Sequence, residues 1–478
     1  MGKQRTILPD WSALMPVRTD PGPRGATLYA ALRRMIEDGR VPPGAKLPPS
    51  RVLAAQARIA RNVVVAAFER LAAEGYVVAR VGAGSFVAPD VPRLAPRAPR
   101  PLPAPALLPA MPGRLGSAMA DPRSFDLLRR LLARDLARPS AAHLHYGDPR
   151  GAPALREAIA GYLRSARAVR VHPDQVMVTS GAQQAIDIVV RTVLAPGDAA
   201  WIEDPAYPMA AALLRGAGQR IVPVRVDAEG LDVAAGRRAA PRARAAYATP
   251  SHQFPLGVAM TMRRRLELLA WAREAGAWII EDDYDSEFRY AGPPLAALQG
   301  IDDAGRVVYV GTFSKSLFPG LRVGYAVLPE AILGKAIALR ERTDRQPSTI
   351  ADGALAAFIA EGHLAAHVRR ARKRARAARD ALVAGLAQGP LLAQAPDQGL
   401  HLVASLPGWL DEARAIEVAA QAGLFARPLS AMHLARRRRT GLVMGFSGFS
   451  PEAFAIAARE ASARLAQLSP RRAARARA

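Results

Sequence analysis

The chain has 478 residues, half of them apolar, and a formal net charge of +25. This length is enough for two or three domains, and the composition is that of a folded protein. The absence of cysteine excludes disulfides and thiolate metal sites. No apolar run is long enough to cross a bilayer and no apolar leader opens the sequence, so we expect a cytoplasmic protein without a membrane partner.

The basic charge favours a polyanionic partner such as nucleic acid. Arginine supplies 61 of the 66 basic residues and lysine only five. A generally arginine-rich composition would raise the charge in the same way, so the total alone does not decide between the two explanations. The local pattern of residues must decide.

Residues 22–88 form the first predicted domain. Apolar residues at helical spacing begin at Leu28, a proline-rich break follows, and Ser50 is placed to cap a second helix. A third helix is predicted from Arg61, and two short strands flank the glycine-rich turn in "RVGAGSFV". Three helices followed by a two-stranded wing is the order of a winged helix-turn-helix domain, whose third helix enters the DNA major groove.

The segments "LYAALRRMIEDGRVPPGAKLPPSRVLAAQ", "ARNVVVAAFERLAAEGYV" and "RVGAGSFV" resemble the DNA-binding domain of the GntR family. The resemblance implies a double-stranded DNA operator as partner. It also implies DNA contacts at the starts of the second and third helices and in the wing, by Arg51, Arg61, Asn62, Arg80 and Gly82. Arginine suits a bidentate contact with guanine or with phosphate. The third helix begins with "ARNVV" where the family usually has a run like Ser-Arg-Thr-Thr.

The rest of the chain divides by composition. Residues 89–120 repeat proline, arginine and alanine without periodicity, which predicts an extended linker. In residues 121–467, apolar runs such as "QVMVTS", "AWIIEDD" and "RVVYVGTFS" alternate with amphipathic helical segments. This alternation predicts an α/β domain with a mainly parallel sheet, with a smaller helix-rich subdomain at about 335–467. Residues 468–478 form a basic tail.

Polar motifs follow three of these predicted strands. The turn in "TSGAQQAID" opens a helix with small residues, as in anion sites at helix N-termini. The run "EDDYDSEF" places several carboxylates at a strand end, where they need a metal ion or a protonated base. In "GTFSKSLFPGLRVGY", Lys315 stands where the chain would usually place an arginine, and only a lysine amine can be deprotonated to attack a carbonyl. Together these groups fit pyridoxal 5′-phosphate (PLP).

Residues 121–467 also resemble the fold-type I aminotransferases. The resemblance is carried by "YGDPRGAPALREAIAGYL", "VTSGAQQAIDIVVR", "EDPAYP", "TPSHQFPLG", "EDDYDSEFRY" and "GTFSKSLFPGLRVGY". With a GntR-like domain in front, the whole chain resembles the MocR-type transcriptional regulators. This resemblance implies a head-to-tail homodimer with PLP as its cofactor.

The resemblance also implies roles for single residues. Lys315 is expected to form the aldimine with PLP, Asp282 to pair with the pyridine nitrogen, and Tyr284 to bond the ring hydroxyl. Tyr207 is expected to stack on the ring, and Tyr146 and Gly147 to lie near the site, either within one chain or across a dimer interface. The phosphate is expected on Ser180, Gly181, Ala182, Ser314 and Arg322.

Two departures from the aminotransferase pattern bear on activity. Phe254 stands before Pro255 where aminotransferases have asparagine, with His252 and Gln253 as partial substitutes. The late strand "TGLVMGFSGF" lacks the arginine that would hold a substrate carboxylate; Arg427 and the run 436–439 are nearby. We therefore expect a regulator with little or no turnover that senses PLP, an amine or an amino acid. The alternative is an aminotransferase with an accessory N-terminal domain.

Overall fold

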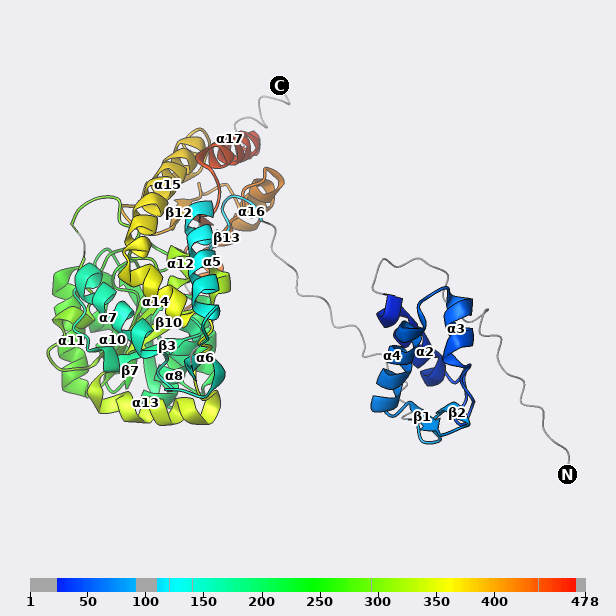
Figure 1. Cartoon of the computed structure of the whole chain (residues 1–478). Coiled ribbons are helices and arrows are strands. Elements are labelled where there is room, and N and C mark those ends of the chain that lie inside the picture. Colours follow the sequence, from blue (N-terminus) through cyan, green and yellow to red (C-terminus); the bar gives the residue numbers. More distant parts are fainter. Residues whose placement is uncertain are drawn as a thin grey trace, which may run out of the picture. The chain divides into compact units, whose positions relative to one another are not determined.

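The computed structural model describes residues 24–91, 110–119, 121–139, 141–293, 295–436 and 438–469. The chain divides into two compact units, Met1–Leu108 and Pro109–Ala478 (Figure 1). Most of the proposed linker 89–120 and of the basic tail 468–478 lies outside the described residues. Within the described part of the chain, no helix is long and apolar enough to span a membrane.

The first unit contains three helices and a two-stranded antiparallel sheet among its described residues. In chain order these are α2 Arg24–Glu37, α3 Ser50–Ala57, α4 Arg61–Ala73, β1 Val77–Arg80 and β2 Gly84–Val87. Their apolar faces meet in one core that contains the buried side chains of Leu32, Leu53, Val64 and Leu71. The order and packing are those of a winged helix-turn-helix domain.

The start of α3 differs from the expectation. Pro49 is the N-cap residue, and no side chain caps this helix. Since Pro49 already has extended backbone angles immediately before the first turn, Ser50 becomes the first helical residue instead of the cap. The Ser50 hydroxyl accepts a hydrogen bond from Arg61 Nε at 3.3 Å, which links the starts of α3 and α4.

The second unit is built on an eight-stranded sheet with the order β3-β10-β9-β8-β7-β4-β5-β6. The strands are β3 Val176–Thr179, β4 Ala199–Asp204, β5 Arg220–Asp227, β6 Gly230–Leu231, β7 Ala245–Ala248, β8 Trp278–Asp283, β9 Val307–Thr312 and β10 Gly324–Val327. Strands β9, β8, β7, β4 and β5 pair in parallel, whereas β10 runs antiparallel to both β3 and β9. The sheet is therefore mainly parallel, as predicted.

Helices cover both faces of this sheet, which explains why its strands are continuous apolar runs. Val308 and Val310 belong to the core under α8 and α13, whereas Val307 and Tyr309 belong to cores on the other face. The helices are α5 Pro122–Leu136, α6 Ala141–Leu144, α7 Pro153–Arg167, α8 Ala182–Val193, α9 Pro208–Gly216, α10 Val233–Ala239, α11 Met262–Ala275, α12 Phe313–Ser316, α13 Glu330–Thr343 and α14 Asp352–Ala360.

The C-terminal part of this unit has its own core around a four-stranded antiparallel sheet with the order β11-β12-β14-β13. Helices α15 and α17 pack closely, because a Cβ added to Gly385 of α15 would lie 2.5 Å from the Ala458 Cβ of α17. The elements are α15 His363–Leu386, β11 Leu392–Ala393, β12 His401–Ser405, α16 Glu412–Gln421, β13 Arg427–Pro428, β14 Leu442–Gly445 and α17 Pro451–Gln467.

Candidate functional site

The three predicted polar motifs meet at one edge of the large sheet. Strands β3, β8 and β9 point the same way, so the residues that follow them lie at the same edge, where open α/β sheets bind ligands. Gly324 at the start of β10 pairs with Thr179 on one side and Thr312 on the other. The pairing places the Ser180–Ala182 turn and the Lys315 turn on either side of β10.

Lys315 lies in the short helix α12, directly after β9. A Cβ added to Gly116 would lie 2.9 Å from Lys315 Nζ, so the amine lies against backbone of another segment. Burial lowers the pKa of Lys315, and the negative charges of Asp285 and Asp282 oppose the shift. A lowered pKa makes the neutral, nucleophilic amine more available, which suits attack on an aldehyde.

Asp282, at the end of β8, is buried, and one of its two oxygens has no hydrogen-bond partner in the described residues. Its Oδ2 accepts a hydrogen bond from the Tyr247 hydroxyl at 2.5 Å. Its Oδ1 is fully buried and accepts no hydrogen bond from any described residue. Burial raises the pKa of Asp282 to about 6. A buried acceptor of this kind needs a donor, and the protonated ring nitrogen of PLP supplies one.

Sequence reasoning missed Tyr247. Tyr247 lies in β7, where it pairs with Ile280 of the neighbouring strand β8. The available signal was a tyrosine in the apolar run "AAYATP", since a buried phenol needs a polar partner. The identity of that partner depends on strand pairing, which the local sequence does not specify.

The other acidic residues after β8 also have side-chain partners. Asp283 Oδ2 accepts hydrogen bonds from Arg167 Nε at 2.8 Å and from the Tyr309 hydroxyl at 2.5 Å. Asp285 lies 3.1 Å from His252 Nδ1. The described residues that could hold a metal ion are His252, Asp285 and His401, whose ligand atoms lie within 4.8 Å of one another. The ring of His401 is bonded through Nε2 to a backbone carbonyl at 3.1 Å, as expected of a buried hydrogen-bonded histidine.

Aromatic side chains line the cofactor edge. Tyr284 donates a hydrogen bond to the His252 carbonyl at 3.0 Å, and its hydroxyl lies 3.1 Å from His252 Nδ1. The ring of Phe254 lies 5.7 Å from that of Tyr207 and 6.2 Å from that of Tyr284. Of the two expected substitutes for asparagine, His252 therefore meets Tyr284, whereas the Gln253 amide donates to the Pro205 carbonyl at 2.9 Å.

The turn between β3 and α8 forms a cradle beside Arg322. Gly181 has a φ of 114°, which favours glycine, and a Cβ there would lie 3.4 Å from both terminal nitrogens of Arg322. Helix α8 begins at Ala182 without a side-chain cap, which leaves backbone amides for an anion. The Ser180 amide is already bonded to Gln184 Oε1 at 2.6 Å. Ser314 accepts a hydrogen bond from the Thr312 hydroxyl at 3.0 Å.

These features fit PLP. They combine a half-buried lysine, a buried carboxylate oxygen that no described residue donates to, and a glycine cradle beside the Arg322 guanidinium, which has no partner among the described residues. Tyr146 lies apart from this set within one chain: it is 78% exposed, and its ring contacts the Arg345 guanidinium at 4.7 Å.

One arginine of the C-terminal sheet, Arg427, lies near this site. Arg427 pairs with Val443 across β13 and β14, and directly paired residues of antiparallel strands share a sheet face. Val443 packs in one apolar cluster with Phe254, so that face is turned toward the cofactor edge. Burial raises the pKa of Tyr207, and the positive charge of Arg427 opposes the shift.

The sequence-predicted DNA contacts form an exposed basic surface on the first unit. Arg51, Arg61, Asn62, Arg80 and Gly82 are all exposed. Within the described part of this unit, Arg51, Arg61 and Arg80 have no carboxylate partner. Unpaired arginines at the start of α4 and in the wing suit phosphate and base contacts.

Three other arginines of this unit are paired, whereas Arg34 and Arg58 have no carboxylate partner among the described residues. The residues Arg33, Arg40 and Arg70 form ion pairs with carboxylates. Arg51, Arg61 and Arg80 are therefore available for DNA, but the absence of a carboxylate partner does not by itself single them out.

Two family patterns match the chain. Residues 25–87 match "Bacterial regulatory proteins, gntR family", and residues 114–445 match "Aminotransferase class I and II". Solved structures similar to the second unit include a multiple substrate aminotransferase from Thermococcus profundus, with a TM-score of 0.68 and 25% identity over 76% of this chain and 93% of that one. A kynurenine aminotransferase from Pyrococcus horikoshii has a TM-score of 0.66 and 26% identity over 75% of this chain and 90% of that one.

Whole-length relatives are regulators. The chain is 36% identical over 454 residues to the probable rhizopine catabolism regulatory protein MocR of Rhizobium meliloti, covering 90% of this chain and 91% of the relative. It is 33% identical to the transcriptional regulator TauR of Rhodobacter capsulatus, covering 91% and 95% of the two chains. It is also 33% identical to the pyridoxine biosynthesis regulator PdxR of Corynebacterium glutamicum, covering 79% and 82%.

The fold and the site define a fusion of a GntR-type DNA-binding domain with a PLP-binding domain of the fold-type I aminotransferase class. The chain belongs to the MocR-type transcriptional regulators.

Proposed function

We propose that this regulator senses PLP, or an amine or amino acid that reacts with it, through Lys315, and that the ligand state of the second unit alters operator binding. The observation that carries the proposal is the buried Asp282 Oδ1, which lies at the same sheet edge as the Lys315 amine and has no donor among the described residues. When bound, PLP supplies an aldehyde that condenses with primary amines. A ligand shifts the conformational equilibrium only if it binds the two states differently.

Each residue of the site has a proposed task. Lys315 supplies the amine, and Asp282 accepts the ring N–H, while Tyr247 holds the Asp282 carboxylate in place by a hydrogen bond of 2.5 Å. Tyr207 is proposed to stack on the ring and Tyr284 to bond its hydroxyl. The phosphate is proposed to bind the Gly181–Ala182 amides, Arg322 and the hydroxyls of Ser180 and Ser314.

The residues at the positions that bind the ring hydroxyl and the substrate carboxylate in aminotransferases favour ligand sensing over catalytic turnover. Phe254 fills the position where aminotransferases offer an amide to the ring hydroxyl. Val443 is buried in β14, the strand in which the carboxylate-binding arginine was expected. Arg427, on the adjacent edge strand, is exposed and has no ion-pair or hydrogen-bond partner among the described residues. We propose that Arg427 binds the carboxylate of the effector where that effector is an amino acid.

Dimerisation is part of the proposal. A head-to-tail homodimer would bring the exposed Tyr146 of the "HYGDPRG" motif to a partner and pair two DNA-binding units on one operator. Light scattering of the purified chain is expected to give twice the monomer mass; a monomer that binds DNA specifically would contradict this arrangement.

The proposed function is tested by fluorescence anisotropy on DNA from upstream of the protein's own gene, at stated salt, with and without PLP and candidate amino acids. The Lys315→Ala variant is compared with Lys335→Ala, which removes an exposed lysine of α13. We expect specific binding that responds to ligand in the wild type and in Lys335→Ala, but not in Lys315→Ala. The visible absorbance band of the lysine-bound cofactor should also be lost only in Lys315→Ala. Binding that responds to ligand equally in all three proteins would refute sensing through Lys315.

A further inference from the structure

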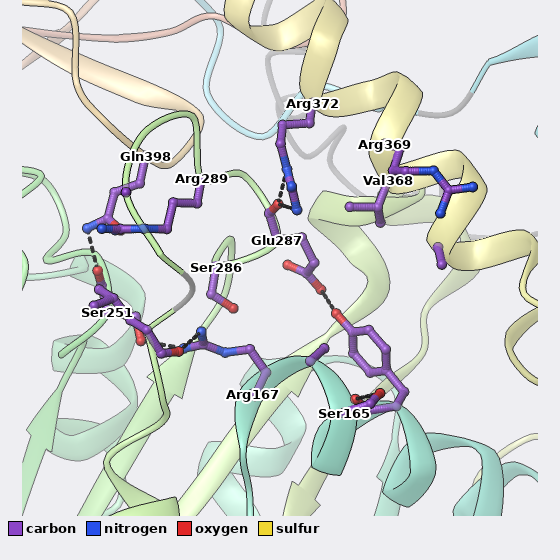
Figure 2. A pocket seen from close by; sticks show the side chains of 15 residues that line it. Ser165, Arg167, Ser251, Ser286, Glu287, Arg289, Val368, Arg369, Arg372 and Gln398 are labelled. Carbon is purple, nitrogen blue, oxygen red and sulfur yellow. Dashed lines mark hydrogen bonds between the residues drawn. The ribbon is translucent and has the colours of Figure 1, made fainter.

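A cavity separate from the PLP-binding residues lies between α15 and the loop that follows β8. Its volume is about 390 Å³, within the usual range for small-molecule sites. Figure 2 shows Arg372 extending from α15 on one side of the opening, Arg289 on another, and Arg167 on the floor. None of the residues assigned above to PLP lines this cavity.

The walls carry more positive than negative charge. Four of the lining residues are arginines: Arg167, Arg289, Arg369 and Arg372. Arg167 is neutralised by its ion pair with Asp283 at 2.8 Å. The other three have no carboxylate partner in the part of the chain that the structure describes.

Two of these arginines are held in place by neutral acceptors. Arg372 donates to the Glu287 backbone carbonyl at 2.7 Å and 3.0 Å. Arg289 donates through Nη1 to Gln398 Oε1 at 2.7 Å, and its buried Nε has no hydrogen-bond partner among the described residues. A buried N–H without an acceptor favours a ligand that supplies one. Positioned guanidinium groups without carboxylates are a common basis of anion recognition.

Among the residues that line the cavity, Glu287 carries the acidic side chain, and it offsets the positive charge of the arginines only partly. Its carboxyl accepts a hydrogen bond from the Tyr162 hydroxyl at 2.9 Å. Burial raises the pKa of Glu287 to about 7, so near neutral pH the group carries less than a full negative charge. The cavity therefore keeps a net positive charge when it holds no anion.

Two residues that line the cavity, Ser251 and Gln398, are each followed in the chain by a residue of the cofactor edge. Gln398 Nε2 donates to the Ser251 carbonyl at 2.6 Å, and Arg167 Nη2 donates to the Ser251 hydroxyl at 2.7 Å. Ser251 precedes His252, the partner of Tyr284, in the chain. Gln398 precedes Gly399, which lies against the His252 ring so closely that an added Cβ would be 1.8 Å from its Cε1. A ligand that moves Arg289 or Gln398 would thus move groups in contact with His252.

We propose that this cavity binds a small phosphorylated metabolite and that its occupancy alters the cofactor site. A phosphate monoester matches the cavity because its oxygens accept several N–H donors and its charge balances the unpaired guanidinium groups. The cavity would give the regulator a second input, separate from the amine sensed at Lys315. This proposal does not depend on which ligand reacts with PLP.

The test uses the full-length protein with PLP fixed to Lys315 by borohydride reduction, so that the cofactor phosphate site is filled. Isothermal titration with glycerol 3-phosphate is compared with titration with succinate. The variants are Arg289→Gln and, on the exposed rim, Arg369→Gln; the matched control is Arg273→Gln, an exposed arginine of α11. The fluorescence of the reduced cofactor is recorded alongside, because occupancy is expected to change it.

We expect saturable binding of glycerol 3-phosphate to the wild type and to Arg273→Gln, with a change in cofactor fluorescence. Affinity should fall about tenfold or more in Arg289→Gln and measurably in Arg369→Gln, since each removes a charged hydrogen-bond donor. No saturable heat up to about 10 mM ligand, or equal affinity in Arg289→Gln and the wild type, would overturn the site. Succinate binding as tight as that of glycerol 3-phosphate would overturn the phosphate assignment.

Discussion

Replacing Asp282 by asparagine should have opposite effects on the empty and the PLP-loaded protein. In the structure, Asp282 Oδ2 accepts a hydrogen bond from Tyr247, while Oδ1 is buried and receives none from the part of the chain that the structure describes. Asparagine has nearly the same shape and can keep the bond from Tyr247 through its oxygen. The substitution therefore removes the charge and leaves the packing.

The magnitude for the empty protein follows from the pKa of Asp282, which burial raises to about 6. Relative to the ordinary aspartate value near 3.9, this corresponds to a penalty of about 3 kcal/mol for the ionised form in the folded state. An acid with a raised pKa favours folding fully only below pH about 4, and this contribution is lost as the pH rises past about 6. The empty Asp282→Asn variant should therefore be more stable than the wild type at pH 8, and the difference should disappear toward pH 4.

The loaded protein should respond in the other direction. Asparagine cannot make the charge-assisted hydrogen bond to a protonated ring nitrogen, which is worth about 1.5–3 kcal/mol, so PLP affinity should fall about 10- to 100-fold. Urea unfolding of the cofactor-free protein at several pH values measures the first effect, and equilibrium dialysis of PLP the second. Unchanged PLP affinity, or an empty variant less stable than the wild type at pH 8, would refute the assigned role of Asp282.

Three further predictions concern other parts of the molecule. Arg61→Ala should weaken DNA binding and, if its contact is to phosphate, lower the slope of log affinity against log salt by about one, whereas the control Arg40→Ala should not; equal anisotropy curves would contradict the placement of α4 on DNA. Arg427→Gln should weaken the spectral response to amino acids about tenfold or more but leave the response to decarboxylated amines unchanged, and an equal loss for both would refute carboxylate recognition. Gly399→Ala should destabilise the protein by at least about 1–3 kcal/mol, because its φ of 79° and the approach to His252 both exclude a Cβ; a melting temperature equal to that of the wild type would contradict this packing.

Much of the fold could be predicted from the sequence because each strand and helix carries a local signal. The apolar runs before Ser180, Asp282 and Lys315 are strands in the structure, with their polar residues at one sheet edge. That edge follows from a rule of chain topology, because parallel strands bring their carboxyl ends together. The sequence alone therefore predicted that the residues of the three motifs share one site, although it gave no distances between them.

The features missed from the sequence depend on contacts between distant segments. The hydrogen bond between Tyr247 and Asp282 requires the pairing of β7 with β8, and the place of Arg427 requires its register with Val443. The arginine-lined cavity joins residues from α7, the loop after β8 and α15, and no local signal in the sequence indicates that these three segments meet. Ser50 shows a different limit, since one neighbouring proline moved the helix start by a residue.

The antiparallel course of β10 has a consequence for how the cofactor site assembles during folding. Strands β9 and β10 form a hairpin, so Lys315 and Arg322 come together through a short closed loop. Asp282 and Gly181 join them only after longer crossovers have closed, and contacts between distant residues form more slowly than local ones. The part of the site that contains Lys315 and Arg322 can thus form before Asp282 and Gly181 join it. Binding of PLP during refolding would therefore show that the whole sheet has formed.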